Sequence, residues 1–139
     1  THQQHDSRHE PLLEHLNTSI DLLWSFAAEK GVADRLTLVV GSDFGRTPRY
    51  NANAGKDHWP IGSIMVMADA PTWGNRVVGK TDEGHNALGI DPLTLDVHQA
   101  GERIYPKTVH AALRRELGID ATGVALGYPL QESLIDFFG

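Results

Sequence analysis

The sequence lacks several features that would place it in a specialised class of protein. It has no cysteine, which excludes disulfides, thiolate zinc sites and thiol redox chemistry. Basic residues are in the minority, with 12 Lys and Arg against 18 Asp and Glu and a formal net charge of -6. A nucleic-acid partner would call for clustered positive charge, so we expect none. No apolar run approaches the ~20 residues that cross a bilayer, so we also expect no membrane span.

What is present is the composition of an ordinary globular domain. The chain has 139 residues, of which 40% are hydrophobic and 22% charged. A chain of this length buries about two-thirds of its unfolded surface, so it needs no structural metal for stability. It opens on Thr1 and His2, in a polar segment without an initiating Met. This start is consistent with a truncated or processed piece of a longer protein.

Hydrophobic periodicity predicts two helices. Apolar residues recur every three or four positions from Leu12 to Ala27, and Pro11 and Gly31 suit the start and end of that helix. A second helix is predicted from about Lys107 to Leu117, with Gly118 as its stop.

Continuous apolar runs predict short strands. The segments "LTLVV" (36–40) and "SIMVMA" (63–68) are typical of strands buried on both faces, and "NRVVGKT" (75–81) suggests a third. Residues 84–103 are rich in Gly, Asp and Pro and predict an ordered loop. This order of elements indicates one α/β domain with a largely parallel sheet.

Two short motifs in the sequence are misleading. Asp43-Phe44-Gly45 matches the magnesium-binding triplet of protein kinases, but the other kinase motifs are missing. "GNRVVGKT" (74–81) matches the phosphate-loop pattern, which needs a helix immediately after it. The following residues contain two glycines and a proline and make a poor helix, so we predict an extended segment and a turn instead.

The segment "GSDFGRTPRYNANAGKDHWP" (41–60) holds the candidate site. Asp43 follows a predicted strand, at the end where α/β sheets bind ligands. Together with His58 it offers oxygen and nitrogen donors suited to zinc, manganese or iron. Asp57 can orient a ligand imidazole from behind, and Arg46 can bind a phosphate, sulfate or carboxylate oxygen.

A purely structural interpretation of these residues is open as well. In it, Asp43 caps a turn, Arg46 pairs with a surface acid and His58 is a hydrogen-bonded loop histidine. Upstream, the spacing of His2, His5 and His9 lets them share one helix face and a metal. The alternative for those three is a frayed polar terminus.

Several motifs carry a resemblance to a known family. They are S-[DE]-F-G-R-T-P at 42–48, N-x-N-x-G at 51–55, [RK]-D-H-W-P at 56–60, G-x-x-V-[IV]-G-x-T-D at 74–82 and L-G-I-D at 117–120. Together they resemble the bacterial domain-of-unknown-function 1501 family, which belongs with the alkaline phosphatase and sulfatase superfamily. The resemblance covers nearly the whole chain. It implies that residues 1–139 are the carboxyl-terminal part of a single alkaline-phosphatase-like α/β domain, with a mostly parallel sheet flanked by helices. A bacterial periplasmic or secreted location is implied too.

The resemblance also implies a metal site. In that superfamily, strand-end Asp and His residues hold one or two divalent metals that bind a phosphate or sulfate ester. By position, Asp43 and His58 are metal ligands, and His2 is the remnant of a D-T-H segment that supplies another. The cation is zinc, manganese or calcium, and Arg46 assists the developing charge. Related enzymes place a second His where this chain has Phe44.

These implications lead to two functional hypotheses. The first is a metal-dependent hydrolase-like domain for small phosphate or sulfate esters. Since the superfamily's nucleophile lies upstream of this segment, we expect the chain alone to be catalytically silent. The second is a non-catalytic module that binds a metal or a sugar on the same fold.

Overall fold

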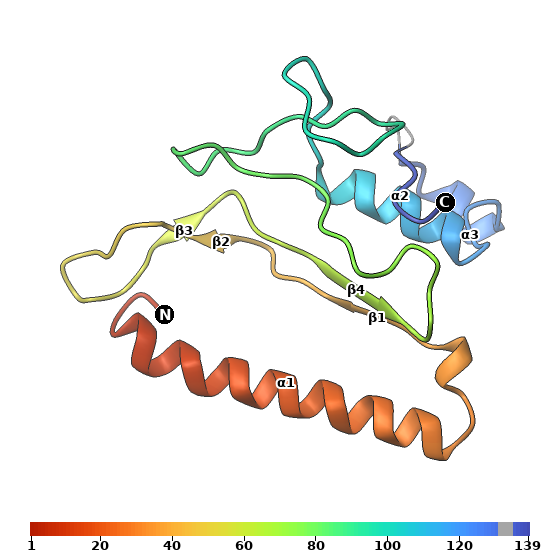
Figure 1. The fold of residues 1–139 in the computed structure, drawn as a ribbon, viewed down its shortest axis with the longest axis horizontal. Coiled ribbons are helices and arrows are strands. Elements are labelled where there is room, and N and C mark those ends of the chain that lie inside the picture. The colour runs from red at the N-terminus through yellow and green to blue at the C-terminus, as the bar shows by residue number, and fades with distance from the viewer. Residues whose placement is uncertain (131–134) are drawn as a thin grey trace. The chain divides into compact units, whose positions relative to one another are not determined.

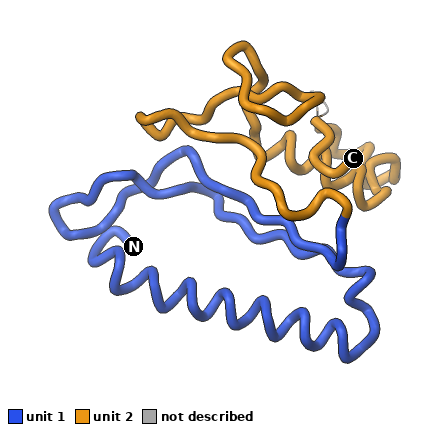
Figure 2. The backbone as a smooth tube through the Cα atoms, viewed as in Figure 1, with its two compact units in different colours: residues 1–71 blue, residues 72–139 orange. Residues whose placement is uncertain are grey.

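The computed structural model describes residues 1–130 and 135–139. The chain forms two compact units, residues 1–71 and 72–139 (Figure 2). The first unit contains α1 (His5–Glu29), the 3-10 helix η1 (Ala33–Arg35), β1 (Thr37–Val40), β2 (Gly45–Arg46), β3 (His58–Trp59) and β4 (Met65–Ala68). The second contains α2 (Pro106–Glu116) and α3 (Gly123–Gly127) (Figure 1).

Helix α1 begins earlier than its sequence predicts. It starts at His5 and carries Pro11 in its interior, although we predicted a start near that proline. The extra turns are anchored by the loop after β2. The backbone N–H of Gln4 donates to the carbonyl of Asn53 at 3.0 Å, and that of His5 donates to Ala54 at 2.8 Å. These bonds satisfy donors that the first turn of a helix leaves open, so the terminus is attached to the loop rather than frayed.

The predicted helix ends are confirmed. Gly31 follows α1 with φ 65°, and Gly118 follows α2 with φ 64°. Glycine takes this left-handed conformation at little cost, which is why it closes helices. The second helix runs over Pro106–Glu116, within one residue of the predicted 107–117.

The two longer apolar runs form strands that pair with each other. Strands β1 and β4 are antiparallel, with Thr37 opposite Ala68 and Val40 opposite Met65. We predicted both strands as members of a largely parallel sheet without naming their partners, and with each other they pair in the antiparallel direction. A parallel pair needs a long crossover, usually a helix, whereas residues 41–64 turn back through the β2–β3 ladder. The larger parallel sheet of an alkaline-phosphatase-like fold stays a prediction.

In the second unit, the predicted strand at 75–81 does not form. Val77 is 93% exposed, so nothing packs on it to favour a strand. Residues 83–88 contain no helix, as predicted, and so the phosphate-loop motif lacks the helix that it requires. The long loop is ordered around the fully buried Ile90, which exchanges two backbone hydrogen bonds with Glu102 at 2.8 and 2.9 Å.

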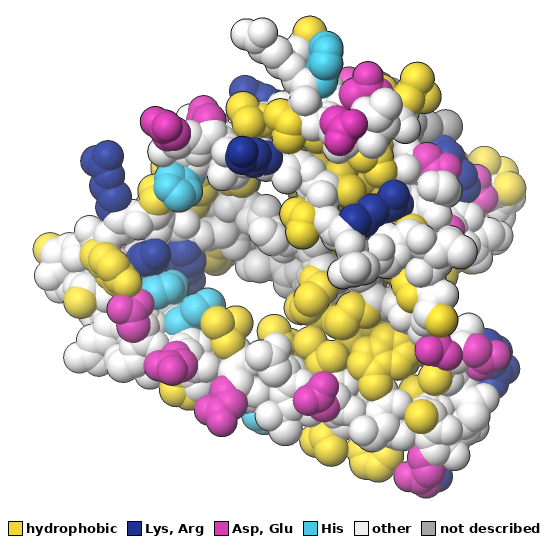
Figure 3. Space-filling view, viewed as in Figure 1, with side chains coloured by type: hydrophobic (Ala, Val, Ile, Leu, Met, Phe, Trp, Pro, Cys, Tyr) yellow, Lys and Arg dark blue, Asp and Glu magenta, His cyan; other side chains and the backbone are white. Residues whose placement is uncertain are grey.

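The surface of the first unit is polar at the end that holds the N terminus, where Figure 3 shows histidine, basic and acidic side chains together. None of the helices in the described part of the chain combines the length and the apolar character that a membrane crossing requires.

Candidate functional site

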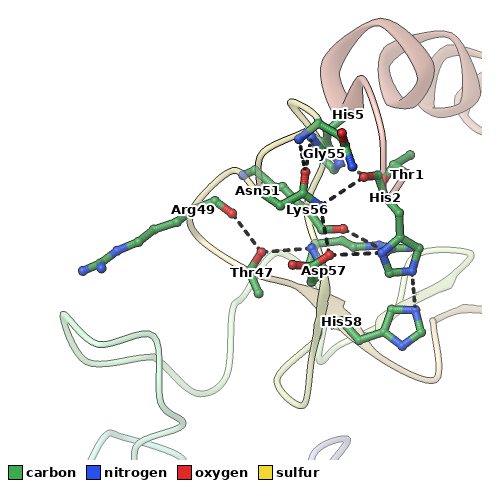
Figure 4. Close-up of polar contacts among 12 residues, drawn as sticks. Thr1, His2, His5, Thr47, Arg49, Asn51, Gly55, Lys56, Asp57 and His58 are labelled. Atoms are coloured by element: carbon green, nitrogen blue, oxygen red, sulfur yellow. Dashed lines mark hydrogen bonds and ion pairs between the residues drawn. The ribbon is translucent and has the colours of Figure 1, made fainter.

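The N-terminal segment reaches the loop after β2 because of a glycine. Besides the two bonds at the start of α1, the N–H of Lys56 donates to the carbonyl of Thr1 at 3.1 Å. Between these contacts lies the buried Gly55, where an added Cβ would come within 1.9 Å of the carbonyl oxygen of His2. Only glycine allows this approach of two backbones. The contacts bring His2 next to residues more than fifty positions away (Figure 4).

His2 and His58 form the centre of the candidate site. Their Nε2 atoms are 3.0 Å apart, and their ring centroids are 4.7 Å apart. His58 is the first residue of β3, and its other neighbour is Phe44, whose ring stacks on it at 3.7 Å. Phe44 therefore supports the imidazole from one face, at the position where relatives are expected to carry a second histidine.

A carboxylate lies behind His2. Oδ1 of Asp57 is 3.2 Å from Nδ1 of His2, and the amide nitrogen of Asn51 donates to the same oxygen at 2.9 Å. The hydrogen bond from Asn51, followed by the one from His2, lowers the pKa of Asp57. A proton held on Nδ1 by this carboxylate leaves the lone pair of His2 on Nε2, directed at His58. Asp57 thus orients His2, and not His58, the residue that follows Asp57 in the sequence.

Asn51 connects all parts of the site. Its amide nitrogen donates to the carbonyl of His2 at 3.0 Å as well as to Asp57. Its side-chain oxygen accepts from the N–H groups of Asn53 and Gly55, both at 3.0 Å. We did not predict this role. The signal was the N-x-N-x-G pattern, since Asn side chains commonly bond the backbone two residues on.

Arg46 lies in the same group of residues but is partly engaged. Its Nη1 donates to the carbonyl of Lys56 at 3.0 Å, and its guanidinium carbon is 5.2 Å from the centre of the Phe44 ring. The side chain is half-buried. A guanidinium has five N–H donors, so Arg46 retains donors for an anion beyond the one that the carbonyl uses.

Asp43 precedes Phe44, the residue that stacks on His58, and is exposed in the structure. Its carboxylate accepts from the hydroxyl of Ser42 at 3.5 Å and makes no hydrogen bond to His2 or His58. Over residues 1–130 and 135–139, no three or more His, Asp or Glu side chains are grouped so as to hold a metal. Of the three predicted metal ligands, the structure brings His2 and His58 together.

The first unit therefore presents a histidine pair backed by a carboxylate, with His2 on the segment before α1 and His58 at the start of β3, where hydrogen bonds join that segment to the loop after β2. Comparison with known families matches residues 1–131 to the family described as "Protein of unknown function (DUF1501)". The chain belongs to this domain-of-unknown-function 1501 family, which confirms the family resemblance. No curated protein and no solved structure matches the chain.

Proposed function

We propose that the chain is a metal-dependent hydrolase-like domain for phosphate or sulfate esters, in which His2 and His58 bind the cation. The supporting observation is the 3.0 Å between their Nε2 atoms. Two imidazole nitrogens that each lie about 2.0–2.1 Å from one metal are about 2.9–3.4 Å apart, depending on the angle between them. Two neutral nitrogens at this distance need a proton or a cation between them.

The surrounding residues fit a metal ligand pair. In many metal sites a carboxylate holds the proton on the second nitrogen of a ligand histidine. Asp57 is in that position relative to His2. Imidazole donors suit zinc better than calcium, which prefers oxygen. Zinc is therefore our first choice among zinc, manganese and calcium. Asp43 is the candidate oxygen donor, because the residue after it, Phe44, stacks on His58.

The chemistry of this arrangement is that of ester binding and polarisation. A bound cation would supply Lewis acidity toward an ester oxygen. The chain's own residues contribute orientation and charge. Asp57 keeps the proton of His2 on Nδ1, and the remaining donors of Arg46 bind a phosphate or sulfate oxygen.

The second candidate function is a non-catalytic module that binds a metal or a sugar, and one contact favours it. The hydroxyl of Ser42, the nearest alcohol to Asp43 in sequence, donates to the carbonyl of Phe44 at 2.9 Å. The carboxylate of Asp43 is 3.5 Å from this hydroxyl, farther than the distance of about 2.6–3.2 Å at which a base activates a nucleophile. We therefore propose that the chain as given binds esters without turning them over.

Zinc titration of the metal-free, untagged protein tests the metal site. His2→Ala and His58→Ala should each weaken zinc binding at least about tenfold, whereas His98→Ala, an exposed histidine of the second unit, should not. Zinc affinity that neither His2→Ala nor His58→Ala changes would overturn the metal proposal.

A separate assay with aryl phosphate and aryl sulfate esters, each with zinc, manganese or calcium, tests catalysis. We expect no turnover. Metal-dependent turnover that disappears in both Asp43→Ala and His58→Ala would show that the chain is a working enzyme.

A further inference from the structure

The three N-terminal histidines separate into two groups in the structure. His2 turns to the loop and contacts His58, whereas His5 and His9 remain on α1. The rings of His5 and His9 stack, with centroids 4.7 Å apart and an angle of 21° between their planes. Both residues are half-buried. This second pair shares no donor atom with the first.

We propose that His5 and His9 form a second metal site, specific for divalent cations that favour imidazole, namely copper, nickel and zinc. Residues four apart on a helix lie one above the other on the same face, and two histidines at this spacing are a known metal-binding arrangement. Imidazole nitrogen suits these three cations in particular. Water completes the coordination in an open two-histidine site of this kind.

His5 is held in the manner of a ligand. Its Nδ1 is 2.7 Å from the hydroxyl oxygen of Thr1 (Figure 4). With that oxygen accepting, Nδ1 carries the proton and Nε2 keeps its lone pair for a metal. Its backbone is fixed by the bond to Ala54, and its ring packs edge to face with that of Tyr50, with centroids 6.4 Å apart. The backbone position and the tautomer of His5 are thus set before a metal binds.

The charge around the pair also favours a cation. Both histidines line one open concavity along α1, with three carboxylate residues among its seven lining residues: His5, Asp6, His9, Glu10, Leu13, Glu14 and Asn17. These carboxylates offset the positive charge of nearby Lys56 and of the helix N-terminus. Burial, and then the neighbouring His9, lower the pKa of His5. A lowered pKa disfavours the protonated imidazole, and the neutral ring is the form that binds a metal.

Binding requires only side-chain rotation. Two nitrogens that share a metal at about 2.0–2.1 Å lie roughly 3 Å apart. The rings of His5 and His9 have centroids 4.7 Å apart, the same centroid separation at which His2 and His58 have nitrogens 3.0 Å apart. Rotation about the side-chain torsions can therefore direct one nitrogen of each ring at a common cation, and the backbone of α1 keeps its position. The site therefore takes both of its ligands from α1 and none from the loop that carries His58.

Nickel titration of metal-free protein without a polyhistidine tag tests this site. The background is the double variant His2→Ala/His58→Ala, which removes the site of the proposed function. In this background one equivalent of nickel should still bind, and adding His9→Ala should weaken it at least about tenfold. The matched control is His15→Ala on the same helix, which has Pro11 and Ser19 at its four-residue neighbours and should change nothing. Nickel affinity that His9→Ala leaves unchanged would overturn the proposal.

A second measurement covers the case in which the double variant loses its helical circular dichroism. In the otherwise unchanged chain, His9→Ala should remove one nickel equivalent and His58→Ala should remove a different one. If only His58→Ala reduces the stoichiometry, the second site does not exist and the proposed function stands. If only His9→Ala does so, the second site is real and the proposed function fails.

Discussion

At the scale of single residues, the uncharged Asn51 does more to hold the site than any charged residue that we predicted. Both of its N–H donors and both acceptor positions of its oxygen are used, toward His2, Asp57, Asn53 and Gly55. An amide is the only side chain of this size that both donates and accepts in this way. Aspartate at this position would lose the two donors and repel Asp57.

Replacing Asn51 by Ala should therefore damage the site and the fold together. We expect a loss of about 1–3 kcal/mol in the free energy of unfolding, and zinc affinity about 10–100-fold weaker because His2 loses its support. Urea denaturation and zinc titration measure the two effects. The control is Asn53→Ala, whose side chain is exposed. Equal zinc affinity in the two variants would contradict this role.

Gly55 is the second residue on which the site depends. Gly55→Ala would place a Cβ 1.9 Å from the carbonyl oxygen of His2, and backbone cannot move aside as a flexible side chain can. We expect a loss of about 2 kcal/mol in stability and faster amide hydrogen exchange at Gln4 and Lys56, whose bonds join the two segments. Gly123→Ala is the matched control, because nothing lies within 4 Å of a Cβ there. Unchanged exchange in Gly55→Ala would refute the close approach.

At the scale of elements, the sequence was informative where the determinants are local. The ends of α1 and α2 follow from Gly31 and Gly118, and both apolar runs became strands. The start of α1 could not be predicted, because the groups that stabilise it belong to Asn53 and Ala54, some fifty residues on. The pairing of β1 with β4 could not be predicted for a related reason, since a hydrophobic run does not show which strand lies beside it or in which direction that strand runs.

The candidate site, too, could be predicted from the sequence only in part. Residue types and the family resemblance together named Asp43, His58 and His2 as ligands, and the structure brings His2 and His58 together. We predicted that Asp57 orients an imidazole, but not that this imidazole belongs to His2. That choice depends on how the N-terminal segment pairs with the loop. Adjacent residues alone could not reveal that pairing.

A hydrogen bond between α1 and the loop gives the link between these elements a pH dependence. The hydroxyl of Tyr50 donates to both carboxylate oxygens of Asp6, at 2.8 and 2.9 Å. This bond, more than burial, raises the pKa of Tyr50. A group whose pKa is raised by folding stabilises the protein fully below its unfolded pKa, about 10 for tyrosine. That stabilisation is lost as the pH rises through the higher folded value.

Tyr50→Phe should accordingly be less stable than the unchanged chain at neutral pH, and the difference should shrink in alkaline solution above about pH 10. Urea midpoints measured from neutral to alkaline pH give this comparison. Tyr128→Phe, at an exposed position in the second unit, should show no such trend. If the stability difference between Tyr50→Phe and the unchanged chain grew with pH, the bond from Tyr50 to Asp6 could not be the cause of that difference.

At the scale of the whole molecule, the chain divides into two compact units, and every residue of both histidine pairs belongs to the first, residues 1–71. The His2–His58 pair exists only when the N-terminal segment is bonded to the loop, so the unfolded chain has no equivalent ligand pair. A cation that binds the folded state alone stabilises it by mass action. Zinc should therefore act on the stability of one unit and not on the other.

We expect zinc at about one hundred times its dissociation constant to stabilise the first unit by about 2.7 kcal/mol. Hydrogen exchange followed by mass spectrometry should show slower exchange in peptides from residues 1–71, and unchanged exchange in peptides from 72–139. His9→Ala serves as the starting protein, so that the second proposed site does not contribute. Adding His58→Ala to it should abolish the protection. Protection spread equally over both units would show that zinc acts on the chain as a whole, and that the cation is not bound by the pair that joins the N-terminal segment to the loop.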